Sequence, residues 1–374
     1  MSEAPTYFIG MLSGTSRDGA DTALVRFESG RPVRVETQCV EYPDDLAALL
    51  RRMVERRRRP DDEEMARADR ELAEFFALAA WGLLDRYEVE RSAVRAIGSH
   101  GQTVWHHPAG HHPESIQLGD PQRIADLTGI PVVGRFRQAD LEAGGQGAPL
   151  APLLHRALLC PESGRRAVLN IGGIANVSLL DPDGNVTGYD TGPGNCLLDA
   201  WVHKQRGENY DASGAWAESG TVDRLLLDQL LADPYFVLPP PKSTGVEYFN
   251  FYWLEGHLRE RGPGGAETDP RDVQATLAEF TAASVAEAVL NAASDELLVC
   301  GGGTHNTDLM RRLKRLLPRM RVTTTAAYGL DPDWVEAILF AWLARERIAG
   351  RPQDTPPITG AREPVILGEI FQPH

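Results

Sequence analysis

The stretch Phe8-Ile-Gly-Met-Leu-Ser-Gly14-Thr-Ser-Arg-Asp18-Gly-Ala-Asp21-Thr-Ala-Leu-Val-Arg-Phe27 consists of two apolar runs joined by a loop of Gly, Ser, Thr and Asp. The pattern predicts a strand, a tight turn and a second strand. Glycine in such a turn lets backbone N–H groups approach an anionic ligand closely. Asp18 and Asp21 would suit a Mg²⁺ ion that accompanies a phosphate, because Mg²⁺ prefers carboxylate and phosphate oxygens. An ordinary polar hairpin turn explains this segment equally well.

A second copy of this design and a third glycine site occur further along the chain. Residues 167–180 again form an apolar run, a turn with Gly172 and Gly173, and a second apolar run. The apolar run 296–300 leads through three glycines, 301–303, into helical spacing over 307–317. A buried strand that opens through glycines onto a helix is a common way for backbone to approach a nucleotide. Together the three segments predict two related halves that each offer a loop to a ligand.

Composition limits the class of protein. With 374 residues the chain exceeds the usual size of one hydrophobic core, so two domains are expected. The net charge of −15 argues against nucleic acid as a partner, because duplex binding depends on neutralising phosphates. The four cysteines lack the spacing of a zinc site or a disulfide framework, and no run approaches the roughly 18 apolar residues of a membrane span. We therefore expect a cytoplasmic protein without a membrane partner.

Apolar periodicity predicts an α/β fold. Helices are expected over 65–87, 269–294 and 331–350, the last with Asp331 as N-cap, and further strands over 93–97 and 130–133. Segment 140–150, rich in glycine, is expected to be a hinge-like crossing. Neither a Walker A sequence nor a G-x-G-x-x-G after a strand is present, which disfavours P-loop NTPases and Rossmann dehydrogenases.

Asp190 is the strongest candidate for a catalytic residue. It ends an apolar run and precedes the rigid Gly192-Pro-Gly194 turn, so its carboxylate would be held at a sheet edge, as a general base requires. A cap of the following helix remains an alternative. His100 follows another expected strand and suits either ligand contact or local hydrogen bonding. The cluster His106, His107, His111 and His112 lies in an apparent loop without partner carboxylates, so we expect no metal there.

These motifs resemble the anhydro-N-acetylmuramic acid kinase family. The resemblance rests on ordered matches from residue 8 to 368, above all Gly144-Gly-Gln-Gly-Ala-Pro-Leu150 and Asp190-Thr-Gly-Pro-Gly-Asn195. It implies two ribonuclease-H-like domains, as in actin-like ATPases, around a central cleft. The expected boundaries are 1–137 plus 356–374 for the N-terminal domain, and 138–355, with helical insertions, for the C-terminal domain. A homodimer is also implied.

The resemblance further implies a coupled reaction in cell-wall recycling. Water opens the 1,6-anhydro ring of the muramyl sugar while O6 takes the γ-phosphoryl group of ATP, which gives N-acetylmuramic acid 6-phosphate and ADP. Asp190 would be the catalytic base, and Asp18 and Asp21 would hold Mg²⁺. The ATP contacts would be Gly14, Thr15, Ser16, Asp18, Gly19, Asp21, Asn170, Gly172, Gly173, Gly301, Gly302, Gly303 and Asn306. The sugar contacts would be His100, Gln102, Arg137, Gly194, Asn195 and Glu336.

Two positions depart from the family pattern. Arg17 stands in the phosphate loop where an apolar residue is common, and Arg135 stands where relatives usually carry Asp. If that Asp orients the following Arg in relatives, Arg137 loses its support here, and substrate affinity is affected. Two other functions stay open: a conventional sugar kinase, in which Asp190 deprotonates a free hydroxyl, and a non-catalytic ATP-binding module. A helix-dipole role also explains Glu336.

Overall fold

The chain forms two compact units. The structure, a computed structural model, describes residues 6–14, 19–55, 59–107, 113–260 and 268–374. Unit 1 comprises Met1–Leu158 and Trp334–His374, and unit 2 comprises Leu159–Asp333. The bounds differ from the expected domains, because residues 138–158 and 334–355 belong to unit 1.

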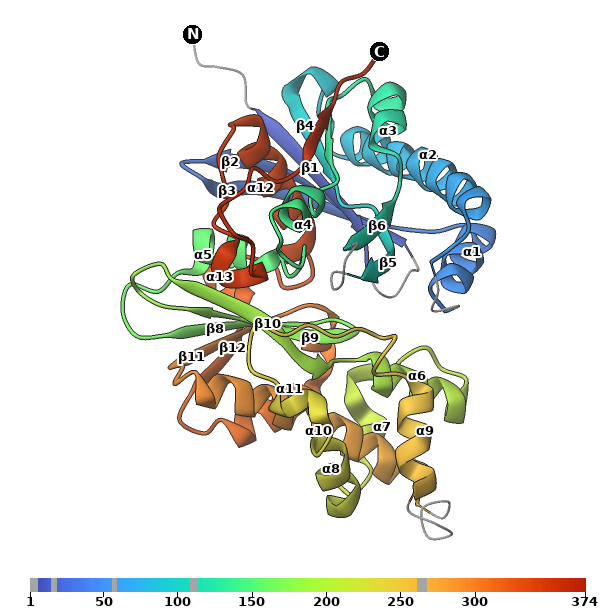
Figure 1. The fold of residues 1–374 in the computed structure, drawn as a ribbon, viewed down its shortest axis with the longest axis vertical. Helices are drawn as coiled ribbons and strands as arrows, with labels where there is room; N and C mark the ends of the chain where they lie inside the picture. Colours follow the sequence, from blue (N-terminus) through green and yellow to red (C-terminus); the bar gives the residue numbers. More distant parts are fainter. Residues whose placement is uncertain (1–5, 15–18, 56–58, 108–112, 261–267) are drawn as a thin grey trace. The chain divides into compact units, whose positions relative to one another are not determined.

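Unit 1 is built on a sheet of six strands in the order β13-β7-β4-β1-β2-β3. Strands β1, β2 and β3 form an antiparallel meander, and β4 and β7 continue the sheet parallel to β1 (Figure 1). A separate two-stranded sheet pairs β5 with β6. The strands are β1 (Tyr7–Ser13), β2 (Gly19–Glu28), β3 (Arg31–Glu41), β4 (Val94–Ser99), β5 (Gln102–His107), β6 (Glu114–Leu118), β7 (Val132–Gly134) and β13 (Glu369–Phe371).

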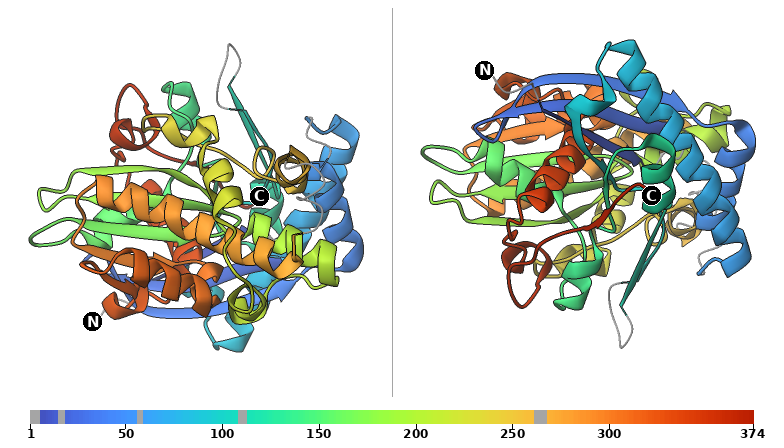
Figure 2. Two further views of the ribbon diagram at one scale, coloured as in Figure 1. Left: turned by 90° about the horizontal axis from the view of Figure 1, so that it is seen from below. Right: turned by 90° about the horizontal axis from the view of Figure 1, so that it is seen from above.

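Unit 1 also has seven α-helices among its described residues. They are α1 (Asp44–Glu55), α2 (Asp62–Arg86), α3 (Pro121–Thr128), α4 (Gln138–Glu142), α5 (Ala151–Leu159), α12 (Val335–Ile348) and α13 (Pro356–Thr359). Figure 2 shows α2 and α3 side by side, and an ion pair of Glu74 with Arg123 joins them. The backbone of α12 touches the sheet, since a Cβ added at Gly10 would lie 1.8 Å from the carbonyl oxygen of Ala337. This contact fixes the first turn of α12 beside β1.

Unit 2 repeats the strand arrangement of unit 1. Its sheet has the order β10-β9-β8-β11-β12, again an antiparallel meander extended by two parallel strands. The predicted α/β fold with two ribonuclease-H-like halves is therefore confirmed. The strands are β8 (Arg166–Ile171), β9 (Ile174–Leu180), β10 (Val186–Pro193), β11 (Glu296–Cys300) and β12 (Arg321–Thr324); the helices are α6 (Cys196–Arg206), α7 (Ala215–Glu218), α8 (Arg224–Leu231), α9 (Phe251–Glu260), α10 (Pro270–Asn291) and α11 (Thr307–Leu316).

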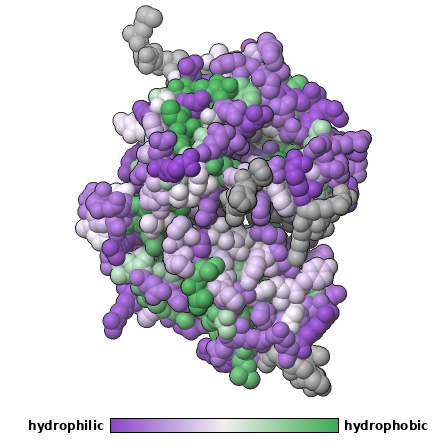
Figure 3. Space-filling view, viewed as in Figure 1, coloured by the Kyte–Doolittle hydropathy of each residue, from purple (hydrophilic) through white to green (hydrophobic). Residues whose placement is uncertain are grey.

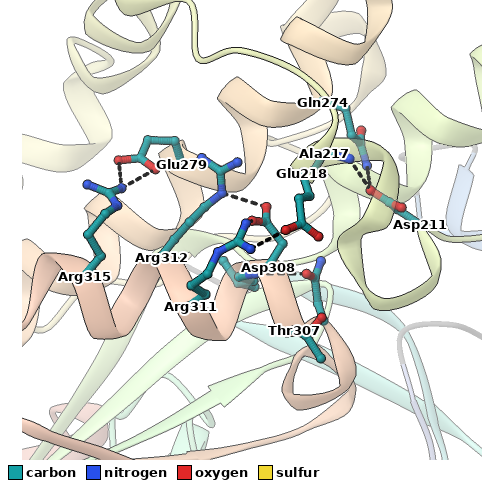
Figure 4. A network of polar contacts seen from close by, with 12 residues as sticks. Asp211, Ala217, Glu218, Gln274, Glu279, Thr307, Asp308, Arg311, Arg312 and Arg315 are labelled. Carbon is teal, nitrogen blue, oxygen red and sulfur yellow. Dashed lines mark hydrogen bonds and ion pairs between the residues drawn. The ribbon is translucent and has the colours of Figure 1, made fainter.

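A buried charge network ties α10 to α11 in unit 2 (Figure 4). Arg312 donates to Asp308 at 2.7 Å and to Glu279 at 2.9 Å, and all three side chains are buried. Burial works against ionisation of Glu279, but the guanidinium groups of Arg315 and Arg312 outweigh it and lower the pKa of this carboxyl. Removing one partner would leave a buried charge without its counter-ion, which costs free energy of unfolding. The network therefore holds the start of α11 against α10.

The sequence misplaced one helix start. The helix expected from Asp331 begins at Val335, and its N-cap position is Trp334. The Asp331 carboxylate instead accepts the N–H of Asp333 at 3.1 Å, so the Asp-Pro signal forms a turn before the helix.

One face of the molecule is drawn in space-filling form in Figure 3. The face seen in Figure 3 is mostly hydrophilic, with scattered apolar patches. Among helices formed by the described residues, none combines the length and the apolar character that crossing a bilayer requires.

Candidate active site

The phosphate loop predicted in unit 1 joins β1 to β2. Gly14 directly follows β1, whereas Thr15, Ser16 and Asp18 lie outside the described residues. Asp21 pairs with Leu12 in the β1–β2 ladder and is half-buried. Gly19 is buried against β3. The predicted metal pair thus has one described member, Asp21, and the described residues contain no cluster of three or more metal-ligating side chains.

His100 and Arg137 form a fixed pair at the end of β4. The His100 ring donates from Nδ1 to the carbonyl of Gly101 at 3.1 Å, which leaves Nε2 to accept from Arg137 at 2.9 Å. Burial, and then the charge of Arg137, hold the pKa of His100 well below its ordinary value. His100 is therefore neutral near pH 7 and acts as a hydrogen-bond acceptor toward Arg137.

Arg137 keeps its support although Arg135 replaces the usual acid. Arg135 turns away, pairing with Glu369 at 3.3 Å and lying over the Phe371 ring at 5.2 Å. Arg137 also donates to the carbonyl of Gly147 at 2.7 Å. In the structure, His100 and the carbonyl of Gly147 therefore orient the Arg137 side chain without an acid at position 135.

Asp140 organises the loop that Arg137 contacts. This fully buried carboxylate accepts the N–H of Gly147 and the hydroxyl of Thr359, both at 2.7 Å. Residues 140–150, expected to be a hinge-like crossing, lie within unit 1. The role of Asp140 has no local signal in the sequence, because its partner Thr359 in α13 is distant along the chain.

Glu336 lies in the first turn of α12, and its charge interacts with Asp21 and Arg137. Its side chain is accessible to solvent, yet the surrounding protein raises the pKa of the Glu336 carboxyl by desolvation. The charge of Asp21 raises this pKa further, and Arg137 opposes the effect. The charges of three predicted site residues thus interact: Asp21 on β2, Arg137 at the N-cap position of α4 and Glu336 on α12.

Gln102 is buried at the start of β5. Its amide oxygen accepts from the Ser13 hydroxyl at 2.5 Å, and its amide nitrogen donates to the carbonyl of Thr103 at 3.0 Å. These bonds attach β5 to the end of β1. Gln102 thus has a local orienting role in addition to the predicted sugar contact.

In unit 2, Asp190 lies on β10 beside a register shift in its pairing with β9. Its carboxylate accepts the N–H of Thr244 at 2.9 Å. Its own N–H donates to the carbonyl of Lys242 at 3.1 Å, and its carbonyl accepts the Tyr235 hydroxyl at 2.6 Å. The N-cap position of α6 is Asn195, so the alternative that Asp190 caps this helix is wrong.

The residues around Asp190 were missed by sequence reasoning. Burial, followed by the charge of Asp190, raises the pKa of the Tyr235 phenol, so Tyr235 stays a neutral donor. Lys242 donates its ammonium to the Tyr235 carbonyl at 3.1 Å and lies 4.6 Å from the ring centre of Tyr235. Burial lowers the pKa of Lys242, and the charge of Glu287 opposes this shift. The only available signal was the polar and proline-rich composition of segment 238–245.

Two of the glycine turns of unit 2, at Gly172–Gly173 and at Gly192–Gly194, are joined by backbone hydrogen bonds. Gly194 donates to the carbonyl of Gly173 at 2.9 Å, and Asn195 donates to that of Gly172 at 2.8 Å. The β8–β9 turn therefore lies against the start of α6. The predicted ATP contacts Gly172 and Gly173 and the predicted sugar contacts Gly194 and Asn195 belong to one backbone cluster.

The Gly301–Gly303 turn meets Asn170 at the end of β8. Gly301 has a φ of +82°, and a Cβ there would lie 2.3 Å from the side-chain oxygen of Asn170. A Cβ on Gly302 would meet nothing within 4 Å. Asn306 is buried, and its side chain caps α11 by accepting the N–H of Leu309 at 2.9 Å. Gly302 thus exposes open backbone, whereas Asn306 has a structural role.

These turns fit a polyphosphate nucleotide. Open space beside Gly302 and the glycine backbone at Gly172 suit an anionic ligand that approaches backbone closely. In unit 1, the half-buried Asp21 carboxylate suits a divalent cation.

A family model described as Anhydro-N-acetylmuramic acid kinase matches residues 6–373. The chain belongs to this family. It is therefore an enzyme of the kinase class, and the resemblance seen in its motifs is confirmed. As a member of the anhydro-N-acetylmuramic acid kinase family, it takes a small sugar as substrate.

Three solved structures align with most of this anhydro-N-acetylmuramic acid kinase family member at low identity. One is an activator of 2-hydroxyisocaproyl-CoA dehydratase from Clostridium difficile with bound ADPNP. It has 12% identity and a TM-score of 0.45, and the alignment covers 92% of this chain and 96% of that chain. A ROK family glucokinase from Streptomyces griseus, in complex with glucose and AMPPNP, has 14% identity and a TM-score of 0.42, and the alignment covers 91% of this chain and 99% of that chain. Ethanolamine utilization protein EutJ from Carboxydothermus hydrogenoformans has 15% identity and a TM-score of 0.38 over 90% of both chains.

Proposed function

We propose that the protein hydrolytically opens the 1,6-anhydro ring of anhydro-N-acetylmuramic acid and phosphorylates O6 with ATP. The products are N-acetylmuramic acid 6-phosphate and ADP, as cell-wall recycling requires. The observation that carries the proposal is the placement of Asp190, whose backbone is held by Lys242 and Tyr235 and whose carboxylate is oriented by Thr244. A general base needs such a fixed position.

In this proposal Asp190 takes a proton from the water that attacks C1. The C1–O6 bond breaks, and its electron pair stays on O6, so no second base is needed to activate that oxygen. O6 then bonds to the γ-phosphorus as the bond from that phosphorus to the ADP oxygen breaks. Attack of water on the face opposite O6 inverts the anomeric centre, as expected for a single displacement with one carboxylate base.

The remaining site residues bind and orient. The backbone at Gly172, Gly173 and Gly301–Gly303 would hold the phosphates of ATP, and Asp21, together with Asp18, would hold Mg²⁺. Bound Mg²⁺ supplies neutralisation of the charge that develops on the phosphates. Arg137, fixed by His100 and Gly147, would bind a sugar oxygen or carboxylate. Glu336 would contact the sugar from α12.

An ADP-release assay with three sugars tests the proposal. Anhydro-N-acetylmuramic acid, N-acetylmuramic acid and N-acetylglucosamine are each supplied with ATP and Mg²⁺, and products are identified by mass. We expect turnover with the anhydro sugar and a product heavier by one water and one phosphoryl group. Turnover with the free sugars alone would identify a conventional sugar kinase, and none with any sugar would support a non-catalytic ATP-binding module.

Two properties implied by the family stay predictions. We propose that the enzyme is a homodimer and works in the cytoplasm, where its substrate would be recovered. Light scattering coupled to gel filtration measures the first, and cell fractionation measures the second. A monomer at all concentrations, or a membrane-bound fraction, would contradict them.

A further inference from the structure

A segment that follows β10 by about 40 residues contacts this strand at Asp190. β10 is the outermost strand of the unit 2 sheet, in the order β10-β9-β8-β11-β12. The N–H of Asp190 donates to the carbonyl of Lys242 at 3.1 Å, and its carbonyl accepts the Tyr235 hydroxyl at 2.6 Å. The N–H of Thr244 donates to the Asp190 carboxylate at 2.9 Å. One short stretch, residues 235–244, therefore holds both the main chain and the side chain of Asp190.

The main chain of β10 is irregular where this segment contacts it. The pairing of β10 with β9 shifts register between Asp190 and Gly192, and Gly192 has a φ of +142°. A Cβ added at Gly192 would lie 2.9 Å from the ring of Phe236, so this ring packs directly on the glycine. A bulge in a strand re-aims the side chains beside it. The direction of the Asp190 carboxylate therefore depends on the groups that hold the irregular stretch from its outer side.

Asp233 fixes the start of the segment. Its side chain belongs to a residue that is only 7% exposed, and its carboxylate accepts three donors. These are the N–H of Tyr235 at 2.8 Å, the hydroxyl of Tyr248 at 2.9 Å and the indole N–H of Trp253 at 3.0 Å. Trp253 lies on α9 and stacks on Phe280 of α10, with 6.0 Å between the ring centres. Since hydrogen bonds to a charged group are the stronger ones, Asp233 joins the segment firmly to α9.

Lys242 holds the same segment from its other end. Its ammonium donates to the carbonyls of Tyr235 at 3.1 Å and Phe236 at 3.4 Å. Tyr235 is thus bonded through its N–H to Asp233 and through its carbonyl to Lys242. With both main-chain groups held and the ring buried, the Tyr235 hydroxyl has a fixed position on the Asp190 carbonyl.

We propose that Asp233 is a positioning residue for the reaction, which acts through Tyr235 to hold Asp190 where its carboxylate meets the attacking water. The inference rests on the proposed function and deepens it by naming the residue that keeps the base in place. Asp233 itself contacts neither substrate nor reacting atoms. The position of a reacting group matters steeply, because a displacement of about 1 Å can cost about 100-fold in rate.

Four variants test this role. Tyr235→Phe removes only the hydroxyl on the Asp190 carbonyl, Asp233→Ala removes the acceptor of all three donors, and Asp233→Asn keeps one acceptor oxygen. Tyr189→Phe is the matched control, because it removes the hydroxyl of another buried tyrosine, one residue before Asp190 on β10. KM and kcat are measured for the anhydro sugar, and thermal unfolding and calorimetric ATP affinity confirm that each variant is folded.

For Tyr235→Phe and Asp233→Ala we expect kcat to fall about 10- to 100-fold, with KM for the sugar within about threefold of wild type. Asp233→Asn should lose less than Asp233→Ala, and Tyr189→Phe should behave as wild type. A smaller fall in kcat for Tyr235→Phe, or a loss carried by KM, overturns the inference.

The same substitutions in an Asp190→Asn background show whether Asp233 acts through Asp190. If it does, adding Tyr235→Phe or Asp233→Ala should lower the residual kcat by less than about twofold, because no base is left to misplace. A merely structural role would lower kcat by the same factor in both backgrounds, and that result would overturn the inference.

If the wild type does not turn over the anhydro sugar, the proposed reaction fails, and hydrogen exchange then tests the positioning by itself. Mass spectrometry of the peptides that contain Asp190 and Thr244 follows the two N–H groups that take part in the contacts. Exchange in both peptides should be faster in Tyr235→Phe and in Asp233→Ala, and unchanged in Tyr189→Phe. Wild-type exchange rates in Tyr235→Phe and Asp233→Ala would show that these residues do not hold Asp190.

Discussion

Replacing Asp190 by Asn tests the proposed base while preserving the shape of the side chain. The Thr244 N–H that bonds the carboxylate at 2.9 Å can still bond the Asn side-chain oxygen, so the segment keeps its position. A hydrogen bond to a charged group contributes about 1.5–3 kcal/mol and one to a neutral group about 0.5–1.5 kcal/mol. Asp190→Asn should therefore lower the free energy of unfolding by only about 1 kcal/mol.

The effect on turnover should be far larger. A positioned general base contributes about 10²–10⁴ in rate, which corresponds to about 3–5 kcal/mol of activation free energy. We expect kcat for ADP release on the anhydro sugar to fall by this factor. Calorimetric affinity for ATP should change less than about twofold, because the variant removes no predicted phosphate contact.

A control on the same sheet separates local chemistry from a general loss of charge. Asp183 accepts the N–H of Asn185 at 3.0 Å in the exposed turn that leads into β10. Asp183→Asn should leave kcat unchanged. The reasoning is refuted if Asp190→Asn is folded, binds ATP and retains more than about one fifth of the wild-type kcat.

Three further outcomes follow from the structure. Gly301→Ala should lower the urea midpoint of unfolding, because position 301 has a positive φ and its Cβ would meet the Asn170 side-chain oxygen. Gly302→Ala, with open space around its Cβ, should leave stability unchanged and raise KM for ATP. An unchanged KM in Gly302→Ala would show that this turn does not contact the nucleotide. Desolvation and the charge of Asp211 raise the pKa of Asp199 from 3.8 to about 7. Between these two pH values the folded protein keeps the proton on Asp199 and the unfolded chain loses it, so the free energy of unfolding falls as pH rises from about 4 through about 7. Asp199→Asn should thus stabilise the protein in urea at pH 8 and not at pH 4; equal midpoints at pH 8 would contradict this shift. Asp140→Asn, which weakens two buried bonds, should lower the unfolding free energy by about 1.5–3 kcal/mol, against less than about 0.5 kcal/mol for exposed Glu142→Gln; similar losses in both would be inconsistent with the role of Asp140.

Local patterns predicted most of the elements around the site. Apolar runs on both sides of glycine turns placed the β1–β2 and β8–β9 hairpins, since such turns are determined by neighbours in sequence. The helix expected over 269–294 is present as α10 with Asp269 as its cap. The start of α12 was misjudged because an Asp-Pro pair suits a turn as well as a helix N-terminus.

The surroundings of the candidate residues could not be predicted, because they come from distant segments. Asp190 is held by Tyr235 and Thr244, which follow it by 45 and 54 residues. Asp140 meets Thr359 across 219 residues. Neither contact leaves a periodic signal in the chain. His106 was assigned to a loop because Pro108 and Gly110 follow it closely in the sequence, whereas the structure places it in β5. His111 and His112 lie outside the described residues.

The origin of the anomeric oxygen tests the account most directly. The enzyme is mixed with anhydro-N-acetylmuramic acid and ATP in ¹⁸O-labelled water, quenched within one turnover, and the sugar phosphate is analysed by mass. We expect one heavy oxygen on C1 and ordinary oxygen in the bond between C6 and phosphorus. A phosphorylated sugar that still has its anhydro bridge, or a first-turnover product without the label, would contradict water attack at C1 coupled to phosphoryl transfer.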